Sequence, residues 1–317
     1  MSGLINVIRA ELFKAKRKRR TYILAGLLWV VLPILILIVG RILQTNLSGS
    51  FVEDTVAVQT LVQQVASPFA VARLNLILPV LSSPPFLMIV IALFAALLIG
   101  EERTQNMWKT TLVTQPNRWS VLFGKITVGM ILYGIILAGA FLSGILFGAV
   151  GTLFLDTSFA GEWGRLAGLY ALQWLLGIGA MMFAFLAIWL LRSVAMGIVT
   201  VLFLPALLEG LYALYRTTVG FQPLNRFNAL FQMLRLRQTL EDLPRYFFTR
   251  NLYAPARDPL SDVVTGLGGD PASSDLGSLV NVLGGSITLQ HATLVTLGYA
   301  LILGGVLTWS FLRRDIP

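Results

Sequence analysis

Long apolar segments alternate with shorter polar ones along most of the chain. Six of the apolar segments reach, or come close to, the roughly 20 residues that a helix needs to cross a bilayer. The second is short, and its helix can begin earlier, near Leu76. The pattern therefore predicts an all-α polytopic membrane protein with six transmembrane helices. The predicted spans are residues 22–43, 84–100, 121–149, 165–190, 194–215 and 291–312.

Residues 1–21 have a different pattern, in which apolar positions recur at helical spacing among basic ones. Leu4, Ile5, Ile8 and Leu12 are the apolar set, which predicts an amphipathic helix in the cytoplasmic interface, held by anionic lipid. A signal peptide is the competing interpretation, but the next apolar run is too long and no small-residue cleavage site follows it. The predicted interfacial anchors are Lys14, Lys16, Arg17, Lys18, Arg19 and Arg20.

Composition supports a chain that is embedded in lipid. Hydrophobic residues make up 56% and charged residues 12%, and the mean hydropathy is +0.78, whereas soluble domains carry about 25% charged residues. The absence of cysteine excludes disulfides, thiol catalysis and cysteine-based zinc sites. The net charge of +9 lies beside apolar spans, so it reflects membrane topology and not nucleic-acid binding.

The basic residues also orient the chain. All five lysines lie either near the N-terminus or in residues 101–125, and basic residues favour the cytoplasmic side. We therefore predict a multi-pass protein of the cell (inner or plasma) membrane with both termini in the cytoplasm. The outer segments would be residues 44–83, residues 150–164 and a long loop at 216–290.

Small residues recur on the predicted spans, for example in Gly144-x-x-x-Gly148. They allow two helix backbones to approach closely. Tight packing within one subunit is the first interpretation, and a dimer seam or a moving gate is the second.

Glu209 is a carboxylate well inside an apolar span. Acids within the membrane are costly and often functional, so Glu209 is a possible substrate or gating residue. At 1.5 Å per residue it lies about 22 Å along its helix, near the outer interface. A hydrated or arginine-paired carboxylate is therefore the alternative.

Two enzymatic motifs are missing from the sequence. There is no GxxxxGK[ST], so the chain has no phosphate-binding loop of its own. Glu101-Glu102-Arg103 begins like the EExxxR motif of intramembrane proteases, but position 106 is Asn106 and the chain has a single histidine, His291. We predict no catalytic, cofactor-binding or metal-binding residues.

Residues 100–125 form the one long polar interruption in the middle of the chain. Its marked positions are Gly100-Glu101-Glu102, Lys109-Thr110-Thr111-Leu112, Pro116, Arg118 and Gly124-Lys125. In this order they resemble the loop after the second span of ABC-2 type transporter permeases. The family's Gly-Thr pair is replaced near Asn106-Met107-Trp108.

The resemblance implies the transmembrane subunit of an ABC exporter, working as a homodimer or a heterodimer. A separate P-loop ATPase, which binds ATP and Mg, would dock on residues 101–120. Residues 104–114 would form a short coupling helix, on which Trp108 and Leu112 offer apolar surface to a groove. The candidate coupling residues are Glu101, Glu102, Arg103, Met107, Trp108, Leu112 and Arg118.

The predicted function is therefore a permease that moves an unidentified, amphipathic or lipidic substrate and leaves ATP hydrolysis to its partner. The alternative is a non-transporting scaffold or mechanotransmission subunit that uses the same ATPase dock. The expected partners are the ATPase, a second permease copy and the bilayer, with no nucleic acid.

Overall fold

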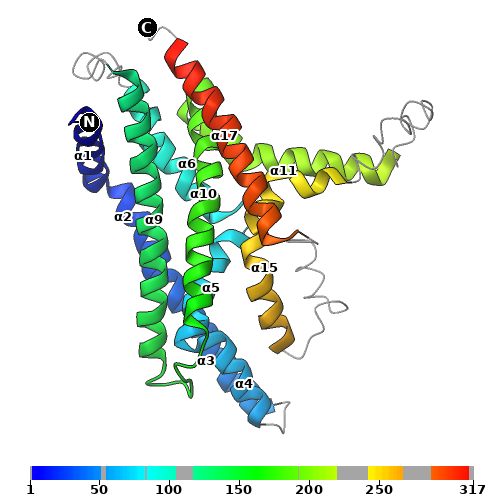
Figure 1. Ribbon diagram of the computed structural model, residues 1–317. Helices are drawn as coiled ribbons and strands as arrows, with labels where there is room; N and C mark the ends of the chain where they lie inside the picture. The colour runs from blue at the N-terminus through cyan, green and yellow to red at the C-terminus, as the bar shows by residue number, and fades with distance from the viewer. Residues whose placement is uncertain are drawn as a thin grey trace.

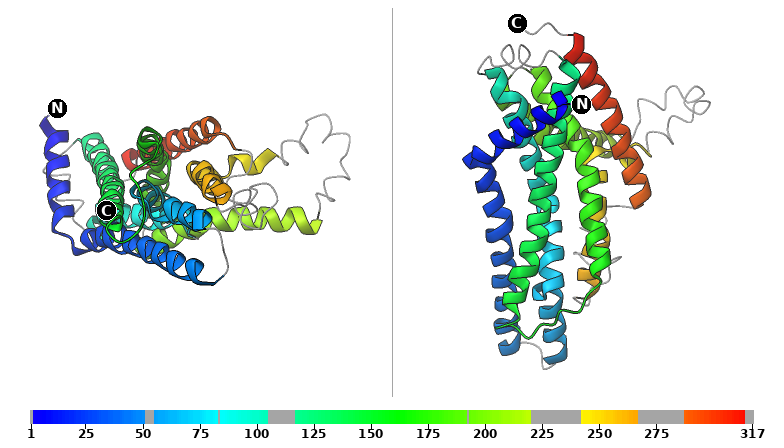
Figure 2. Two further views of the ribbon diagram at one scale, coloured as in Figure 1. Left: turned by 90° about the horizontal axis from the view of Figure 1, so that it is seen from below. Right: turned by 60° about the vertical axis from the view of Figure 1, so that its left-hand side comes forward.

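The computed structural model shows an all-α polytopic membrane protein. Every regular element in the described part of the chain is a helix. Most of these helices run along a common axis, and α1 (Ser2–Arg17) lies across one end of the bundle (Figures 1 and 2). The structure describes residues 2–50, 55–82, 84–104, 117–191, 193–219, 242–266 and 287–313.

Five helices in the described residues are long and apolar enough to cross a membrane. The first, Arg19–Thr45, joins three successive elements into one rod. Those elements are α2 (Arg19–Gly26), the π-helix η1 (Leu27–Val31) and α3 (Leu32–Ser50). The other four helices are α9 (Arg118–Gly151), α10 (Trp163–Leu191), α11 (Val194–Val219) and α17 (Leu289–Arg313).

A sixth span is formed only if two bent segments are taken together. α5 (Pro68–Leu81) and the run Phe86–Gly100 meet at an angle of 71°. That run consists of α6 (Phe86–Ala95) and the π-helix η2 (Ala96–Gly100). Ser82 and the prolines around residue 85 interrupt the helix here, because proline lacks an N–H group to donate.

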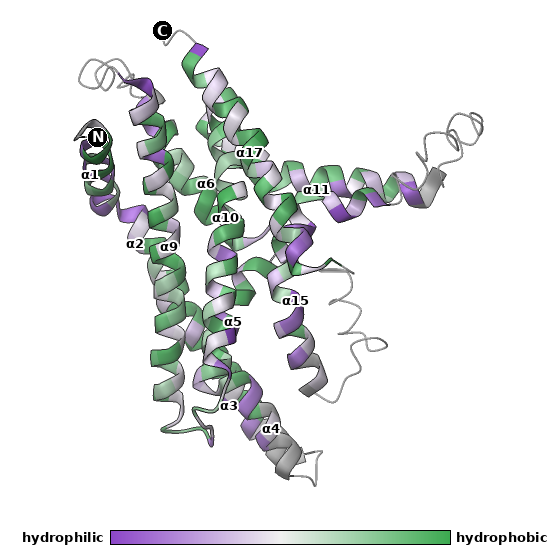
Figure 3. Cartoon of the chain, viewed as in Figure 1, coloured by the Kyte–Doolittle hydropathy of each residue, from purple (hydrophilic) through white to green (hydrophobic). Residues whose placement is uncertain are grey.

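Two segments that the sequence placed in outer loops contain helices. The segment 44–83 includes the end of α3, α4 (Thr55–Ala66) and α5. The segment 216–290 includes the end of α11, the 3₁₀ turn η3 (Leu243–Tyr246) and α15 (Phe248–Gly266). Polar residues are more frequent on α15 than on α9 and α17 (Figure 3).

The glycine pair at 144 and 148 brings α9 against α5 within this one chain. A Cβ atom on Gly144 would lie 2.5 Å from Cα of Ala72, and one on Gly148 would lie 2.4 Å from Cα of Pro68. Only glycine permits such an approach of two backbones. In the same contact the buried Asn75 side chain donates to the carbonyl of Ala140 at 2.6 Å.

α11 differs from the other long helices in its direction. It runs across the axis of the bundle in Figures 1 and 2 and leaves many apolar side chains exposed. Its first turns are packed against the bundle: a Cβ on Gly197 would lie 2.9 Å from Cα of Ile188 on α10. The apolar pattern of residues 194–215 therefore predicts the helix but not its direction.

Candidate coupling site

α1 packs against the start of α9, and glycine makes this contact possible. A Cβ on Gly124 would lie 2.6 Å from Cγ1 of Val7. Val7 and Ala15 are buried on the same face of α1. One face of the amphipathic helix therefore contacts protein, while Ile5 and Phe13 stay exposed.

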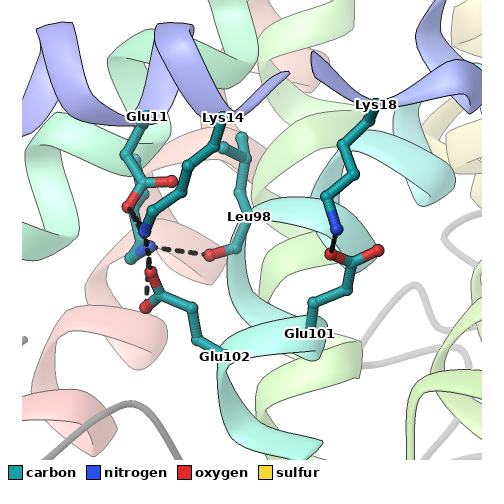
Figure 4. Close-up of polar contacts among 7 residues, drawn as sticks. Glu11, Lys14, Lys18, Leu98, Glu101 and Glu102 are labelled. Carbon is teal, nitrogen blue, oxygen red and sulfur yellow. Dashed lines mark hydrogen bonds and ion pairs between the residues drawn. The ribbon is translucent and has the colours of Figure 1, made fainter. Parts of the chain in front are cut away.

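The next residue of α9, Lys125, is fully buried and lies at the centre of an ionic cluster. Three oxygen atoms lie close to its Nζ: Glu11 Oε1 at 2.7 Å, Glu102 Oε2 at 2.9 Å and the Leu98 carbonyl at 2.8 Å. Lys14 Nζ lies 2.6 Å from Glu102 Oε1 and 3.2 Å from Glu11 Oε1. We call Glu11, Lys14, Glu102 and Lys125 the buried cluster, in which Lys14 alone is partly exposed. Figure 4 labels the first three of these residues.

The backbone of η2 contributes to this site. A π-turn interrupts the regular hydrogen bonding of an α-helix, and such turns are frequent at functional sites. Leu98, in the middle of η2, directs its carbonyl to Lys125. The short helix α7 (Glu101–Thr104) follows directly and carries Glu102 into the cluster.

The charges of the buried cluster balance, with two carboxylates and two ammonium groups. Burial opposes the ionisation of Glu102, but Lys125 and Lys14 outweigh it and hold the pKa of this carboxyl below its usual range. Burial likewise opposes the charge on Lys14, but Glu102 and Glu11 raise the pKa of its ammonium above its usual value. Both groups are therefore charged at neutral pH.

A second set of ion pairs lies nearer to solvent. Lys18 Nζ contacts Glu101 Oε2 at 2.5 Å, and Arg20 lies 3.5 Å from the other oxygen of Glu101. Together the two sets join α1 and its junction with α2 to the polypeptide that leaves η2. The ion pairs therefore connect Glu101 and Glu102 to α1 and to α9.

Residues 7–208 of the chain match the family model that is described as ABC-2 family transporter protein. The chain belongs to the ABC-2 transporter family. The matched region contains all four residues of the buried cluster, and the chain is a permease of an ABC transporter. No curated protein and no solved structure matches it.

The six basic residues predicted as interfacial anchors of this permease do not share one environment, because some contact protein groups and others are exposed. Lys14, Lys18 and Arg20 pair with carboxylates on α7, and Arg17 lies 4.2 Å from the centre of the Phe13 ring. Lys16 and Arg19 are exposed. Binding of this helix to anionic lipid stays a prediction.

The coupling residues predicted from the sequence are only partly described. Met107, Trp108 and Leu112 lie outside the described residues, as does the side chain of Arg103. Arg118 donates to the carbonyl of Leu312 at 3.2 Å. The two described ends of this loop therefore contact α1 and the C-terminal turn of α17, respectively.

Glu209 lies on α11 and takes no part in the buried cluster. Its Oε1 accepts a hydrogen bond from the backbone N–H of Thr249 at 3.1 Å. Thr249 is in the first turn of α15, where N–H groups lack partners within the helix. This contact gives Glu209 a role in holding α15, and a substrate or gating role stays a prediction.

Sequence reasoning missed Glu11 as a member of the site. The signal was present, because Glu11 follows Leu4 and Val7 at helical spacing on the apolar face of α1. An acid on the buried face of an otherwise basic helix requires a cationic partner. No local pattern pairs Lys125 with Glu11, because the two residues are 114 positions apart in sequence.

Proposed function

We propose that this chain is the permease through which a separate ATPase drives an amphipathic or lipidic substrate across the cell membrane. The ATPase would dock on residues 101–120 from the cytoplasm, where both termini would lie, and would bind ATP and Mg itself. Two permease copies would line the path. Membership of the ABC-2 transporter family supports the general role.

The observation that carries the proposal is the position of Lys125. Its ammonium group links Glu11 on α1, Glu102 at the start of the predicted docking loop and the Leu98 carbonyl in η2. A push on the loop therefore reaches an interfacial helix and two spans through a single buried contact. Removing one partner of such a contact is costly, so the three segments would move together.

The docking surface is tested by co-purification with the partner ATPase. Trp108→Ala combined with Leu112→Ala should remove the apolar surface of the loop and lose most of the bound ATPase. Leu153→Ala combined with Phe159→Ala is the matched control, because both side chains are exposed at the other end of the bundle. Undiminished capture by the loop variant would falsify the docking assignment.

The transmission step is tested separately with Glu102→Gln. This variant should still capture the ATPase, because Glu102 is only 5% exposed and contacts Lys14 and Lys125, so it adds almost nothing to the exposed surface of the loop. The permease variant should stimulate ATP hydrolysis by the ATPase less than the parent does, because Lys14 and Lys125 lose a charged partner. A variant that keeps full stimulation of the ATPase would show that the cluster only stabilises the fold.

A further inference from the structure

A large cavity lies in the half of the bundle away from α1. Its volume is about 1210 Å³, and its walls come from α4, α5, α10, α15, α17 and the segment before α10. Ligand pockets commonly measure about 300–1,000 Å³. The cavity therefore has room for an amphiphile with at least one acyl chain.

Two arginines in the wall have weakly satisfied guanidinium groups. Asp262 Oδ2 lies 3.8 Å from Arg73 and 3.4 Å from Arg165. The Arg73 side chain is only 11% exposed, and its Nε has no hydrogen-bond acceptor in the described part of the chain. A guanidinium group has five N–H donors and binds phosphate in a bidentate manner. An anionic group with several oxygens would satisfy both arginines.

The same wall also has unused capacity to accept hydrogen bonds. Oε1 of Gln64 is buried without a donor among the described residues. Asp258 and Glu162 add carboxylates near the cavity, so the wall carries three acids against two arginines. A purely anionic ligand would face an excess of negative charge. A primary ammonium group would supply both the missing positive charge and the N–H donors.

The rest of the wall is apolar and well supported. Leu166, Leu169 and Leu294 line it beside Phe69. The Phe69 ring is held edge-on by Trp163, with ring centres 5.7 Å apart, and Arg73 lies 5.5 Å from its centre. An acyl chain can therefore lie on a surface that begins next to the arginines.

We propose that this cavity binds an aminophospholipid, with its phosphate between Arg73 and Arg165, its primary ammonium toward Gln64 and Asp258, and its chain on the leucines of α10. The proposal concerns a binding site on the permease itself. It does not depend on the ATPase dock, so it can fail while the proposed coupling stands.

Native mass spectrometry of the purified full chain measures the predicted binding. Three lipids with identical acyl chains are compared: phosphatidylethanolamine, phosphatidylcholine without N–H donors and phosphatidylglycerol without an ammonium group. We expect phosphatidylethanolamine to bind about tenfold more tightly than either, because it alone combines a phosphate with a charged group that donates N–H hydrogen bonds. Equal affinity for all three would overturn the proposal, and equally tight phosphatidylglycerol would overturn the ammonium contact.

Variants locate the binding in the cavity. Arg73→Gln and Arg165→Gln should each weaken phosphatidylethanolamine binding about tenfold. Arg245→Gln is the control, because Arg245 is an exposed arginine that pairs with Asp242 at 3.3 Å outside the cavity. If Arg73→Gln does not fold, the test relies on lipid binding by Arg165→Gln, because Arg165 is the more exposed of the two arginines. Unchanged affinity in Arg165→Gln, or an equal loss in Arg245→Gln, contradicts the site.

Discussion

The permease handles charge in two different ways in the two halves of its bundle. Near α1, three oxygen atoms lie within 2.9 Å of the buried Lys125 ammonium. In the cavity, Arg73 and Arg165 reach Asp262 only at 3.8 and 3.4 Å. The first arrangement surrounds one fully buried ammonium group with oxygens, whereas the second leaves Arg73 Nε and Gln64 Oε1 without hydrogen-bond partners among the described residues.

The difference follows from the backbone that carries each set of charges. Gly124 lets α1 approach α9 closely, and Lys125 beside it is fully buried. In the cavity wall, Arg73 on α5 and Arg165 on α10 approach Asp262 on α15 only at 3.8 and 3.4 Å. A buried charge pair with close contacts favours a joint that transmits motion. A loose pair beside apolar surface favours a binding site.

Removal of Lys125 should lower the free energy of unfolding more than the other substitutions below, because it removes the centre of the buried cluster. Lys125→Met leaves Glu11 and Glu102 close together in a buried site with only Lys14 between them. We expect a loss of about 3–5 kcal/mol, measured by thermal unfolding in detergent. Lys125→Met combined with Glu11→Gln restores the charge balance and should recover part of the loss. A single variant as stable as the parent would show that the cluster is not a tight joint.

The second prediction concerns the backbone behind the cavity. Gly144→Ala places a Cβ 2.5 Å from Cα of Ala72, the residue before Arg73. It should cost about 1–3 kcal/mol through overpacking and shift the cavity wall, which weakens lipid binding. Gly164→Ala is the matched control, because a Cβ there has no neighbour within 4 Å. Equal stability of the two variants, from the same unfolding measurement, would contradict the close α5–α9 contact.

The buried cluster also predicts a pH window for the docking of α1. The pKa of Glu102 lies below 4.5 in the fold, so its contribution is complete above pH 4.5 and is lost as the pH falls through the lowered value. The pKa of Lys14 lies above 10.5, so its contribution is complete below pH 10.5 and is lost above the raised value. Docking should therefore be strongest between these limits.

Hydrogen exchange of the α1 amides, corrected for intrinsic rates, measures this window. Protection should decrease at the acidic limit, and Glu102→Gln should remove that decrease. Amides of α17 serve as the internal reference, because α17 takes no part in the buried cluster. Protection of α1 that stays constant through the acidic limit would exclude a role for Glu102 in its docking.

The smallest effect is expected in the cavity. Arg165 is 53% exposed and its ion pairs with Glu162 and Asp262 measure 3.7 and 3.4 Å. Exposed pairs contribute about 0–1 kcal/mol, so Arg165→Gln should hardly change the unfolding temperature while it weakens lipid binding. A large loss of stability in this variant would show that the charges in the cavity stabilise the fold, as the charges near α1 do.

The apolar pattern predicted the helical class and the long spans because a helix in lipid needs about 20 apolar residues. It allowed the second span to begin near Leu76 and so included only the end of α5, because Arg73 and Asn75 interrupt the apolar run before that point. The Asn75 amide is satisfied by Ala140 on α9, a partner that no local pattern reveals. The direction of α11 likewise depends on how its first turns pack against α10.

For the site, the sequence by itself determined which charges must be satisfied. It placed Glu101 and Glu102 after an apolar run, a basic helix at the start and a Gly-Lys pair at 124–125. Only the tertiary structure decided that Lys125 meets Glu11 and Glu102, whereas Arg73 and Arg165 share a cavity with Asp262. The physical reason is that hydropathy depends on each residue alone, whereas a buried charge depends on partners that are distant in sequence.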